Sequence, residues 1–212
     1  MLLDWLQRRF RARRMAELAR LARLTERTRV LDVGGTAEIW SFAPVTPRIT
    51  FLNQARASHE IGERSQVVLG DGLRLPFRDR SFDLVFSNSV IEHVGDAGAQ
   101  AQFAAELARV GKQYWVETPN RGFPVEQHLW TPVVHWLPKA WQRRLVPRCS
   151  LWALLTKHTR EEREFYFRHY LDSVHLLSEA DLRALFPGAI VLRERFLGWP
   201  KALVAWRKES VT

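Results

Sequence analysis

Two short apolar runs within residues 67–94 are the feature that most constrains the fold of this chain. Residues 67–69 and 82–86 are mostly apolar, and turn-forming or polar residues bound each run. Runs of this length and composition are typical of strands buried inside a parallel sheet. Asp71 follows the first run, and Asn88 and Ser89 follow the second. Because open α/β sheets bind ligands at the carboxyl ends of their strands, the segment predicts a parallel sheet with a ligand site beyond these two strands.

Strand and helix patterns alternate along most of the chain. Strand patterns cover residues 29–33, 49–52 and 112–117, an alanine-rich helical pattern covers residues 97–110, and a helix is expected between the strands at 49–52 and 67–69. Only a short helix fits after the first strand, because Pro44 and Pro47 follow closely. Ser178 begins a capping box, and residues 189–196 and 202–206 form a hairpin pattern. This order predicts βαβ units, hence a mainly parallel sheet with a C-terminal antiparallel hairpin.

Residues 119–177 interrupt this order, being aromatic and basic without strand periodicity. They contain four tryptophans and five of the seven histidines. Because 212 residues suit one α/β domain, we predict a single domain over residues 1–212 in which this segment is a helical and loop insertion that forms a lid. The other parts are an N-terminal helix at 1–26, a core at 28–118, and a C-terminal helix and strands at 178–206. The tryptophans fit an apolar substrate, a membrane interface or the lid's own core, and these alternatives stay open.

Residues 1–26 have the pattern of a basic amphipathic helix. Leucines and other apolar residues recur mostly at three- and four-residue steps, and seven arginines occupy much of the remaining surface. Such a helix can lie on a membrane surface. It can equally cover the sheet and keep its arginines in solvent, and the sequence favours neither interpretation.

Charge and cysteine content bear on partners and compartment. The formal net charge of +9 favours anionic partners, either lipid or nucleic acid, although a solvated basic surface explains it equally well. Cys149 is the single cysteine, so the chain has no internal disulfide and no multi-cysteine metal site. No apolar run approaches the roughly 20 residues that cross a bilayer, and the N-terminus lacks a secretory signal pattern. We therefore expect a cytoplasmic protein, free or peripheral at the inner face of an anionic membrane.

Residues 30–36, VLDVGGT, together with the 67–94 segment, resemble the class I S-adenosylmethionine-dependent methyltransferases, specifically the methyltransferase type 11 group. The resemblance covers residues 28–118 closely and residues 178–206 loosely. It implies a Rossmann-like three-layer sandwich, S-adenosyl-L-methionine as cofactor and methyl transfer as the activity. The family usually has an acidic residue and three alternating glycines after the first strand. Here Asp32 and Gly34 match, whereas Thr36 and Glu38 take the second and third glycine places.

The resemblance also implies which residues contact the cofactor. Asn53 stands where the family usually has an acidic residue for the ribose hydroxyls, and its amide can bond a hydroxyl without the charge assistance of a carboxylate. Asp71 matches the segment that contacts adenine, and Asn88 matches the rim after the fourth strand. The full predicted set is Asp32, Gly34, Gly35, Thr36, Asn53, Asp71, Gly72, Leu73, Asn88 and Ser89.

Candidate catalytic residues follow from position, because methyl transfer from a sulfonium depends on aligning the acceptor rather than on one residue type. Glu117 ends a predicted strand, and His128 lies near the start of the insertion and has the more suitable unperturbed pKa. Each can also simply order a loop. Glu92 and His93 together do not make a metal site, and the remaining histidines match no zinc spacing. We therefore expect no metal and a structural role for His93.

Three functions compete at this stage. We expect methyl transfer to a small-molecule acceptor that is mostly apolar or lipid-like. The departures at Thr36, Glu38 and Asn53 motivate a second reading, a non-catalytic ligand-binding or membrane-associated protein on the same fold. RNA methylation is the third, but the basic residues are spread over two segments and no RNA-binding module is present, so we expect no nucleic-acid partner.

Overall fold

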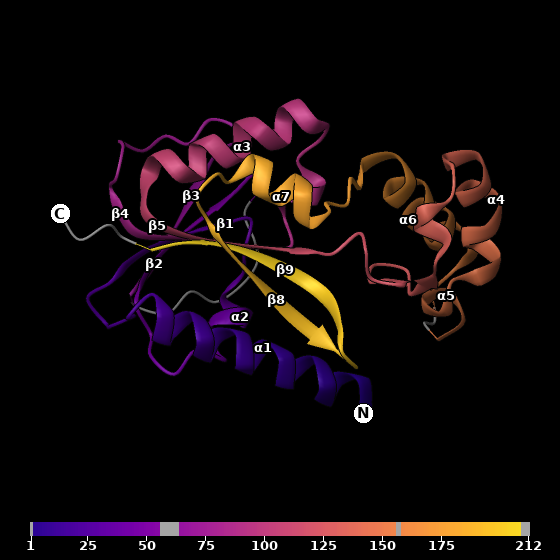
Figure 1. The fold of residues 1–212 in the computed structure, drawn as a ribbon, viewed down its shortest axis with the longest axis horizontal. Helices are drawn as coiled ribbons and strands as arrows, with labels where there is room; N and C mark the ends of the chain where they lie inside the picture. Colours follow the sequence, from indigo (N-terminus) through magenta and orange to yellow (C-terminus); the bar gives the residue numbers. More distant parts are fainter. Residues whose placement is uncertain (1, 56–63, 156–157, 209–212) are drawn as a thin grey trace.

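The computed structural model describes residues 2–55, 64–155 and 158–208, with the backbone alone for residues 2–4 and 6 (Figure 1). At its centre is a seven-stranded sheet in the order β3-β2-β1-β4-β5-β9-β8. The strands are β1 (Arg29–Val33), β2 (Arg48–Asn53), β3 (Ser65–Leu69), β4 (Phe82–Asn88), β5 (Gly111–Pro119), β8 (Ile190–Phe196) and β9 (Trp199–Arg207). The first five are parallel, and β9 is antiparallel to its neighbours β5 and β8. The predicted Rossmann-like three-layer α/β fold with a C-terminal antiparallel hairpin is confirmed.

The two runs that most constrained the prediction have different positions in the sheet. β4 lies in the middle, and Leu84, Val85 and Phe86 are fully buried. β3 is at one edge of the sheet, and its side chains are half-buried or exposed. The prediction that both runs are buried strands is therefore confirmed for β4 and wrong for β3. An edge strand has a neighbouring strand on one side only.

Successive side chains of the central strands enter two separate cores, as the two-residue period of a strand requires. Leu31 and Val85 face a core with helices α3 (Ala97–Val110) and α7 (Glu179–Leu185). Val30 and Leu84 face a core on the opposite side, with α1 (Leu2–Leu21) and α2 (Ala37–Trp40). Figure 1 shows α3 and α7 above the sheet and α1 and α2 below it. Both cores are apolar because both faces of the sheet are covered.

The N-terminal helix α1 completes the layer that α2 is too short to form. α2 spans four residues, as the prolines after it predict, so it covers little of the sheet. Met15 and Leu18 of α1 are fully buried beside Trp40 in the lower core. This packing supports the interpretation of α1 as a covering helix. The apolar positions Leu2, Leu3 and Leu6 have side chains outside the described residues.

Several predicted elements are confirmed at the residue level. α3 has the predicted bounds and begins at Asp96, whose side chain accepts a hydrogen bond from the backbone N–H of Ala99 at 3.0 Å. α7 begins with the predicted capping box at Ser178 and Asp181. The helix expected between β2 and β3 falls mostly on residues 56–63, outside the described part of the chain.

The insertion forms a small helical body beyond the carboxyl end of β5 (Figure 1). It contains the short strands β6 (Val125–Glu126) and β7 (Thr131–Pro132), then α4 (Lys139–Cys149), α5 (Leu151–Leu155) and α6 (Arg160–Ser173). It has a core of its own, which includes Val146, Phe167 and Tyr170. We call residues 119–177 the lid. Within the described residues, no helix is long and apolar enough to span a membrane.

Candidate functional site

A cavity of about 340 Å³ lies at the carboxyl ends of β1, β2 and β3. Open α/β sheets bind ligands at this place. Five of the ten predicted cofactor-binding residues line it, namely Gly34, Asn53, Asp71, Gly72 and Leu73. The turn after β4 and helix α3 complete the wall with Val90, His93, Val94 and Phe103. Position along the chain could have suggested Val90 and His93, because both directly follow a predicted strand.

The turn after β1 needs glycine for steric reasons. Gly34 has a φ of +78°, and a Cβ there would lie 2.7 Å from Val90. A Cβ on Gly35 would lie 2.2 Å from the carboxylate oxygens of Asp32. Such contacts are far shorter than van der Waals separation, so only glycine allows the backbone to approach this closely.

Asp32 lies fully buried behind this turn. Its Oδ2 accepts a hydrogen bond from Trp40 Nε1 at 2.8 Å, and its Oδ1 has no partner among the described residues. Burial raises the pKa of Asp32 to about 7, and the Trp40 hydrogen bond opposes this shift. An unpaired buried acceptor favours a cationic group nearby, such as the amino group of S-adenosylmethionine, over an anionic phosphate. The four-residue α2, which Thr36 precedes as N-cap, is also too short to hold a phosphate at its N-terminus.

The ribose and adenine positions also fit the expected cofactor. Asn53 Nδ2 donates to the carbonyl of Gly35 at 3.1 Å, which leaves the side-chain oxygen to accept from a ribose hydroxyl. Asp71 Oδ1 accepts from the backbone N–H of Leu73 at 2.9 Å, so its second oxygen can accept from the exocyclic amine of adenine. A Cβ on Gly72 would lie 2.6 Å from the Phe103 ring. Glycine thus lets the backbone approach the apolar wall that would contact the adenine ring.

Asn88, Ser89 and Glu117 belong to a different arrangement, a buried polar network around Arg14. Arg14 forms ion pairs with Glu117 at 3.1 Å and with Glu194 at 2.9 Å. It also donates to Asn88 Oδ1 at 2.5 Å, and Ser89 Oγ donates to Glu117 Oε2 at 2.9 Å. Burial lowers the pKa of Arg14, but the two carboxylates outweigh it and raise that pKa. None of these side chains lines the cavity, so their predicted roles in binding and proton transfer stay predictions.

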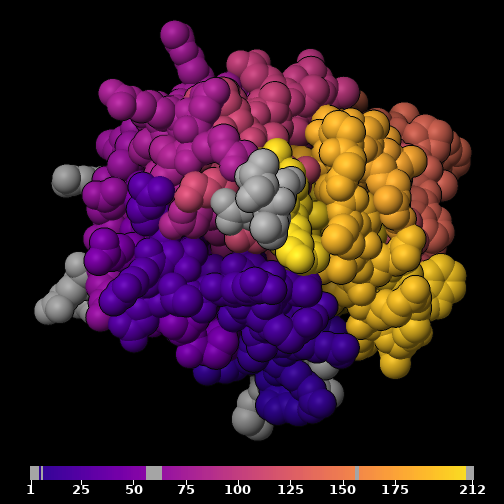
Figure 2. Space-filling model, turned by 60° about the vertical axis from the view of Figure 1, so that its left-hand side comes forward, coloured from indigo at the N-terminus to yellow at the C-terminus, as the bar shows by residue number. Residues whose placement is uncertain are grey.

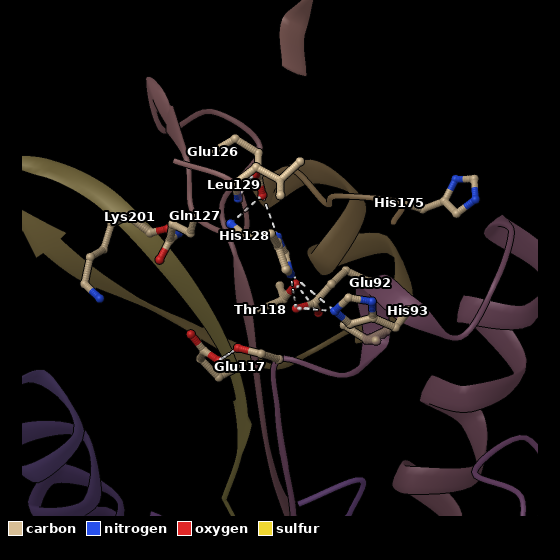
Figure 3. A network of polar contacts seen from close by, with 12 residues as sticks. Glu92, His93, Glu117, Thr118, Glu126, Gln127, His128, Leu129, His175 and Lys201 are labelled. Carbon is tan, nitrogen blue, oxygen red and sulfur yellow. Dashed lines mark hydrogen bonds and ion pairs between the residues drawn. The ribbon is translucent and has the colours of Figure 1, made fainter. Parts of the chain in front are cut away.

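A second polar cluster lies where the lid meets the core (Figure 3). His93 ends the short 3-10 turn after β4 (Ile91–His93), and His128 follows β6 in the lid. Their Nε2 atoms are 3.2 Å apart. Glu92 Oε1 lies 3.9 Å from the first of these nitrogens and 4.0 Å from the second. We call Glu92, His93 and His128 the lid-base cluster.

The charges of the lid-base cluster are set by burial and by Glu126. His128 Nδ1 lies 2.5 Å from Glu126 Oε1. Burial and then the neighbouring His128 lower the pKa of His93 to about 4. Burial also favours the neutral form of His128, but Glu126 outweighs it and raises the pKa of that ring. Burial and then Glu117 raise the pKa of Glu92 to about 7.

The sequence predicted His128 as a catalytic candidate and His93 as structural, without linking them. The structure brings both histidines together with Glu92, and His93 also lines the cofactor cavity. We expected no metal here because Glu92 and His93 alone, as neighbours in the chain, do not make a metal site. His128, 35 residues further along, supplies the third potential ligand.

Comparison with known proteins gives one family match. Residues 41–114 match the family model described as a methyltransferase domain. The matched region runs from the end of α2 to within β5 and includes Asp71 and His93, but neither the glycine turn nor the lid. No curated protein sequence matches the chain significantly.

Several solved structures resemble this chain at low sequence identity. A protein described as a sarcosine dimethylglycine methyltransferase from Galdieria sulphuraria is 24% identical, with a TM-score of 0.43; the match covers 49% of this chain and 43% of that one. A protein described as a Zn-dependent alcohol dehydrogenase from Rhodobacter sphaeroides is 11% identical over 88% of this chain and 85% of that one, with a TM-score of 0.58. An S-adenosylmethionine-dependent methyltransferase from Methanosarcina mazei is 13% identical over 87% and 94%, with a TM-score of 0.50.

The fold alone is thus shared with proteins described by different activities, and the site must decide between them. The glycine turn backed by a buried acid, the Asp71 segment and the family match agree with one another. On these grounds, the chain is similar to the class I S-adenosylmethionine-dependent methyltransferases, and this similarity implies S-adenosylmethionine as its cofactor.

Proposed function

We propose that this protein transfers the methyl group of S-adenosylmethionine to a small acceptor that is mostly apolar or lipid-like. The observation that supports this proposal most strongly is the apolar character of the lid surface. Nine of the fourteen large apolar side chains that are exposed in the structure lie there, namely Val133, Trp136, Leu137, Trp141, Leu151, Leu154, Leu155, Phe165 and Tyr166. Exposed apolar groups gathered in one region are typical of surfaces that bind apolar ligands, membranes or partners.

The residues of the cavity bind and orient the donor in this proposal. Bound S-adenosylmethionine supplies an activated methyl group on its sulfonium. Asn53 and Asp71 accept hydrogen bonds from its ribose and adenine, and the apolar wall around Phe103 excludes water from the ring. His93 stands at the boundary between this cavity and the lid, where the acceptor would enter.

The proposed roles of Glu117 and His128 differ in the support they have. Glu117 already balances the charge of Arg14 and accepts a hydrogen bond from Ser89, which suits it to hold that network together. His128 is anchored through Nδ1 to Glu126, and its Nε2 is directed at His93. His128 is therefore the better candidate for a group that acts on the acceptor.

Calorimetry with S-adenosylmethionine tests the donor half of this proposal. We expect one molecule bound per chain and a loss of about 1–3 kcal/mol in binding free energy for Asp71→Asn, since one charge-assisted hydrogen bond disappears. Asp79→Asn is the matched control, because Asp79 is exposed. It lies before the amino end of β4, whereas the cavity lies at the carboxyl ends of the strands. A folded protein that does not bind the cofactor would support the non-catalytic reading and overturn this one.

Transfer of a labelled methyl group tests the acceptor half. The purified protein is incubated with labelled S-adenosylmethionine and either a lipid extract or total RNA. Label in the lipid-soluble products supports the proposal. Label in RNA, with binding that falls steeply as salt increases, would instead favour the RNA acceptor that the basic charge suggests.

A further inference from the structure

The lid-base cluster has the geometry of a metal site. The two Nε2 atoms are 3.2 Å apart. Two nitrogens bound to one zinc ion at about 2.0–2.1 Å in a tetrahedron lie about 3.3–3.4 Å from each other. The three potential ligand atoms of Glu92, His93 and His128 all lie within 4.8 Å of one another. A small movement of the carboxylate would bring its oxygen to the same distance as the nitrogens.

Hydrogen bonding explains only part of this arrangement. With its Nδ1 directed at Glu126, a neutral His128 can accept at Nε2 from His93. That bond would satisfy both Nε2 atoms. It would still leave Glu92 Oε1 buried and without a hydrogen-bond partner among the described residues. A cation between the three atoms satisfies all of them at once.

Glu92 is held so that its free oxygen faces the histidines. Its Oε2 accepts from Thr118 Oγ1 at 3.0 Å, which fixes the plane of the carboxylate. The side chain is completely buried, and Oε1 has no hydrogen bond. A buried carboxylate without a compensating charge is costly, and a bound cation would remove that cost.

Glu126 provides the outer support that metal-binding histidines usually have. It is buried and accepts from His128 Nδ1, and it also accepts from the backbone N–H groups of His128 at 2.9 Å and Leu129 at 2.8 Å. A carboxylate on the far nitrogen fixes the ring orientation and leaves Nε2 free to bind a metal.

We propose that Glu92, His93 and His128 bind a divalent metal ion, with zinc the best match, and that Glu126 is the positioning residue for His128. Two histidines and one carboxylate with a vacant fourth position are typical of catalytic zinc sites rather than structural ones. The side chains of His93 and His128 are 35% and 25% exposed, so the cluster is open to solvent on one side.

The fourth position points to the class of acceptor, an inference that rests on the proposed function. His93 lines the cofactor cavity, so a ligand at the vacant position would lie between that cavity and the lid. Oxygen is a ligand that zinc accepts readily. A hydroxyl group of the acceptor therefore fits this position, and the methylated atom would be oxygen. The ion would lower the pKa of the bound hydroxyl so that its proton leaves to solvent. The oxygen would then bond to the methyl carbon as the carbon–sulfur bond breaks, and S-adenosylhomocysteine would leave.

Zinc binding by the full-length protein tests the site directly. Chelator-treated protein is titrated with Zn²⁺ against a chromophoric chelator, and we expect one ion per chain with a dissociation constant of about 1 µM or tighter. Glu126→Gln should weaken binding about 10–100-fold, and His128→Ala should weaken it more. His158→Ala, a histidine elsewhere in the lid, is the control and should bind as the parent does. Glu92→Gln keeps the shape of the buried side chain and tests its charge if an alanine variant does not fold.

Cobalt provides a second readout. Co²⁺ bound by this set should give the visible absorption of a tetrahedral site, and His128→Ala should abolish it. Absence of stoichiometric Zn²⁺ binding by folded protein would overturn the proposal, as would equal binding by His128→Ala. S-adenosylmethionine binding is measured on the same metal-free protein. If S-adenosylmethionine binds and zinc does not, the metal proposal fails and the proposed function stands. If zinc binds and S-adenosylmethionine does not, the metal site stands and the proposed function fails.

Discussion

The cofactor cavity and the lid-base cluster lie side by side but are built in different ways. The cavity is formed mainly by short continuous segments that follow β1, β2, β3 and β4, and Phe103 of α3 completes its wall. The lid-base cluster joins side chains from two distant segments, Glu92 and His93 after β4 and His128 in the lid. A cavity of the first kind depends on where glycine stands. A cluster of the second kind depends on how the lid docks.

Arg14→Met should have the largest effect, because Arg14 joins the ends of β4 and β5 in a buried network, next to the turn that carries residues of both regions. The change removes a buried charge and leaves Glu117 and Glu194 without their shared partner, at an expected cost of about 3–5 kcal/mol in the free energy of unfolding. Urea denaturation measures this cost. Arg13→Met, at the exposed neighbouring position, is the control and should change stability little. Equal losses for the two variants would mean that the network is not essential.

Gly72→Ala should damage the cavity alone. The new Cβ would lie 2.6 Å from the Phe103 ring, so the ring or the turn must move, at about 1–3 kcal/mol. We expect weaker S-adenosylmethionine binding by calorimetry and unchanged zinc affinity. Gly98→Ala places the same substitution in α3 and should leave cofactor binding intact. Loss of both ligands with Gly72→Ala would show that the two regions are not separable.

Asn53→Asp should exchange stability for affinity. An aspartate can offer the ribose a charge-assisted hydrogen bond, which is about 1 kcal/mol stronger and would tighten cofactor binding about fivefold. The same change removes the donor to the Gly35 carbonyl and should lower the free energy of unfolding by about 1 kcal/mol. Calorimetry and denaturation measure the two effects separately. Unchanged affinity would indicate that the ribose is held elsewhere.

Leu154→Gln should have the smallest effect on stability, within about 0.5 kcal/mol, because the side chain is exposed. It should nevertheless reduce binding to anionic lipid vesicles in a sedimentation assay if the lid surface contacts apolar acceptors. Leu69→Gln, an exposed leucine on edge strand β3, is the matched control. The same reduction in both variants would remove the special role of the lid.

The sequence predicted what local pattern determines. The bounds of α3 and the capping box at Ser178 were correct, because amphipathic period and cap residues act within a few positions. The cavity residues Asp71 and Gly72 were found in the same way, since both closely follow the predicted strand at 67–69. Burial of β3 was wrong because the order of strands in the sheet is a tertiary property.

Convergence of distant side chains could not be predicted from the pattern. Arg14 is one of seven arginines in a basic segment, and nothing in its neighbours distinguishes the one that points inward to Glu117. His93 and His128 do not have the spacing of a zinc motif, because the lid and not one helix brings them together. The two histidines come together only because the lid docks on the turn after β4.

The contact between α1 and the C-terminal hairpin has a consequence for the order of events during synthesis. Arg14 pairs with Glu194, 180 residues later, and Phe10 packs against Phe196; in Figure 2 the N-terminal segment borders the C-terminal one on this face. This helix thus leaves the ribosome before the hairpin that it binds, which is made 180 residues later. The apolar side of α1 stays uncovered by the hairpin until these residues have been made, which predicts slow folding and a need for protection from aggregation until then.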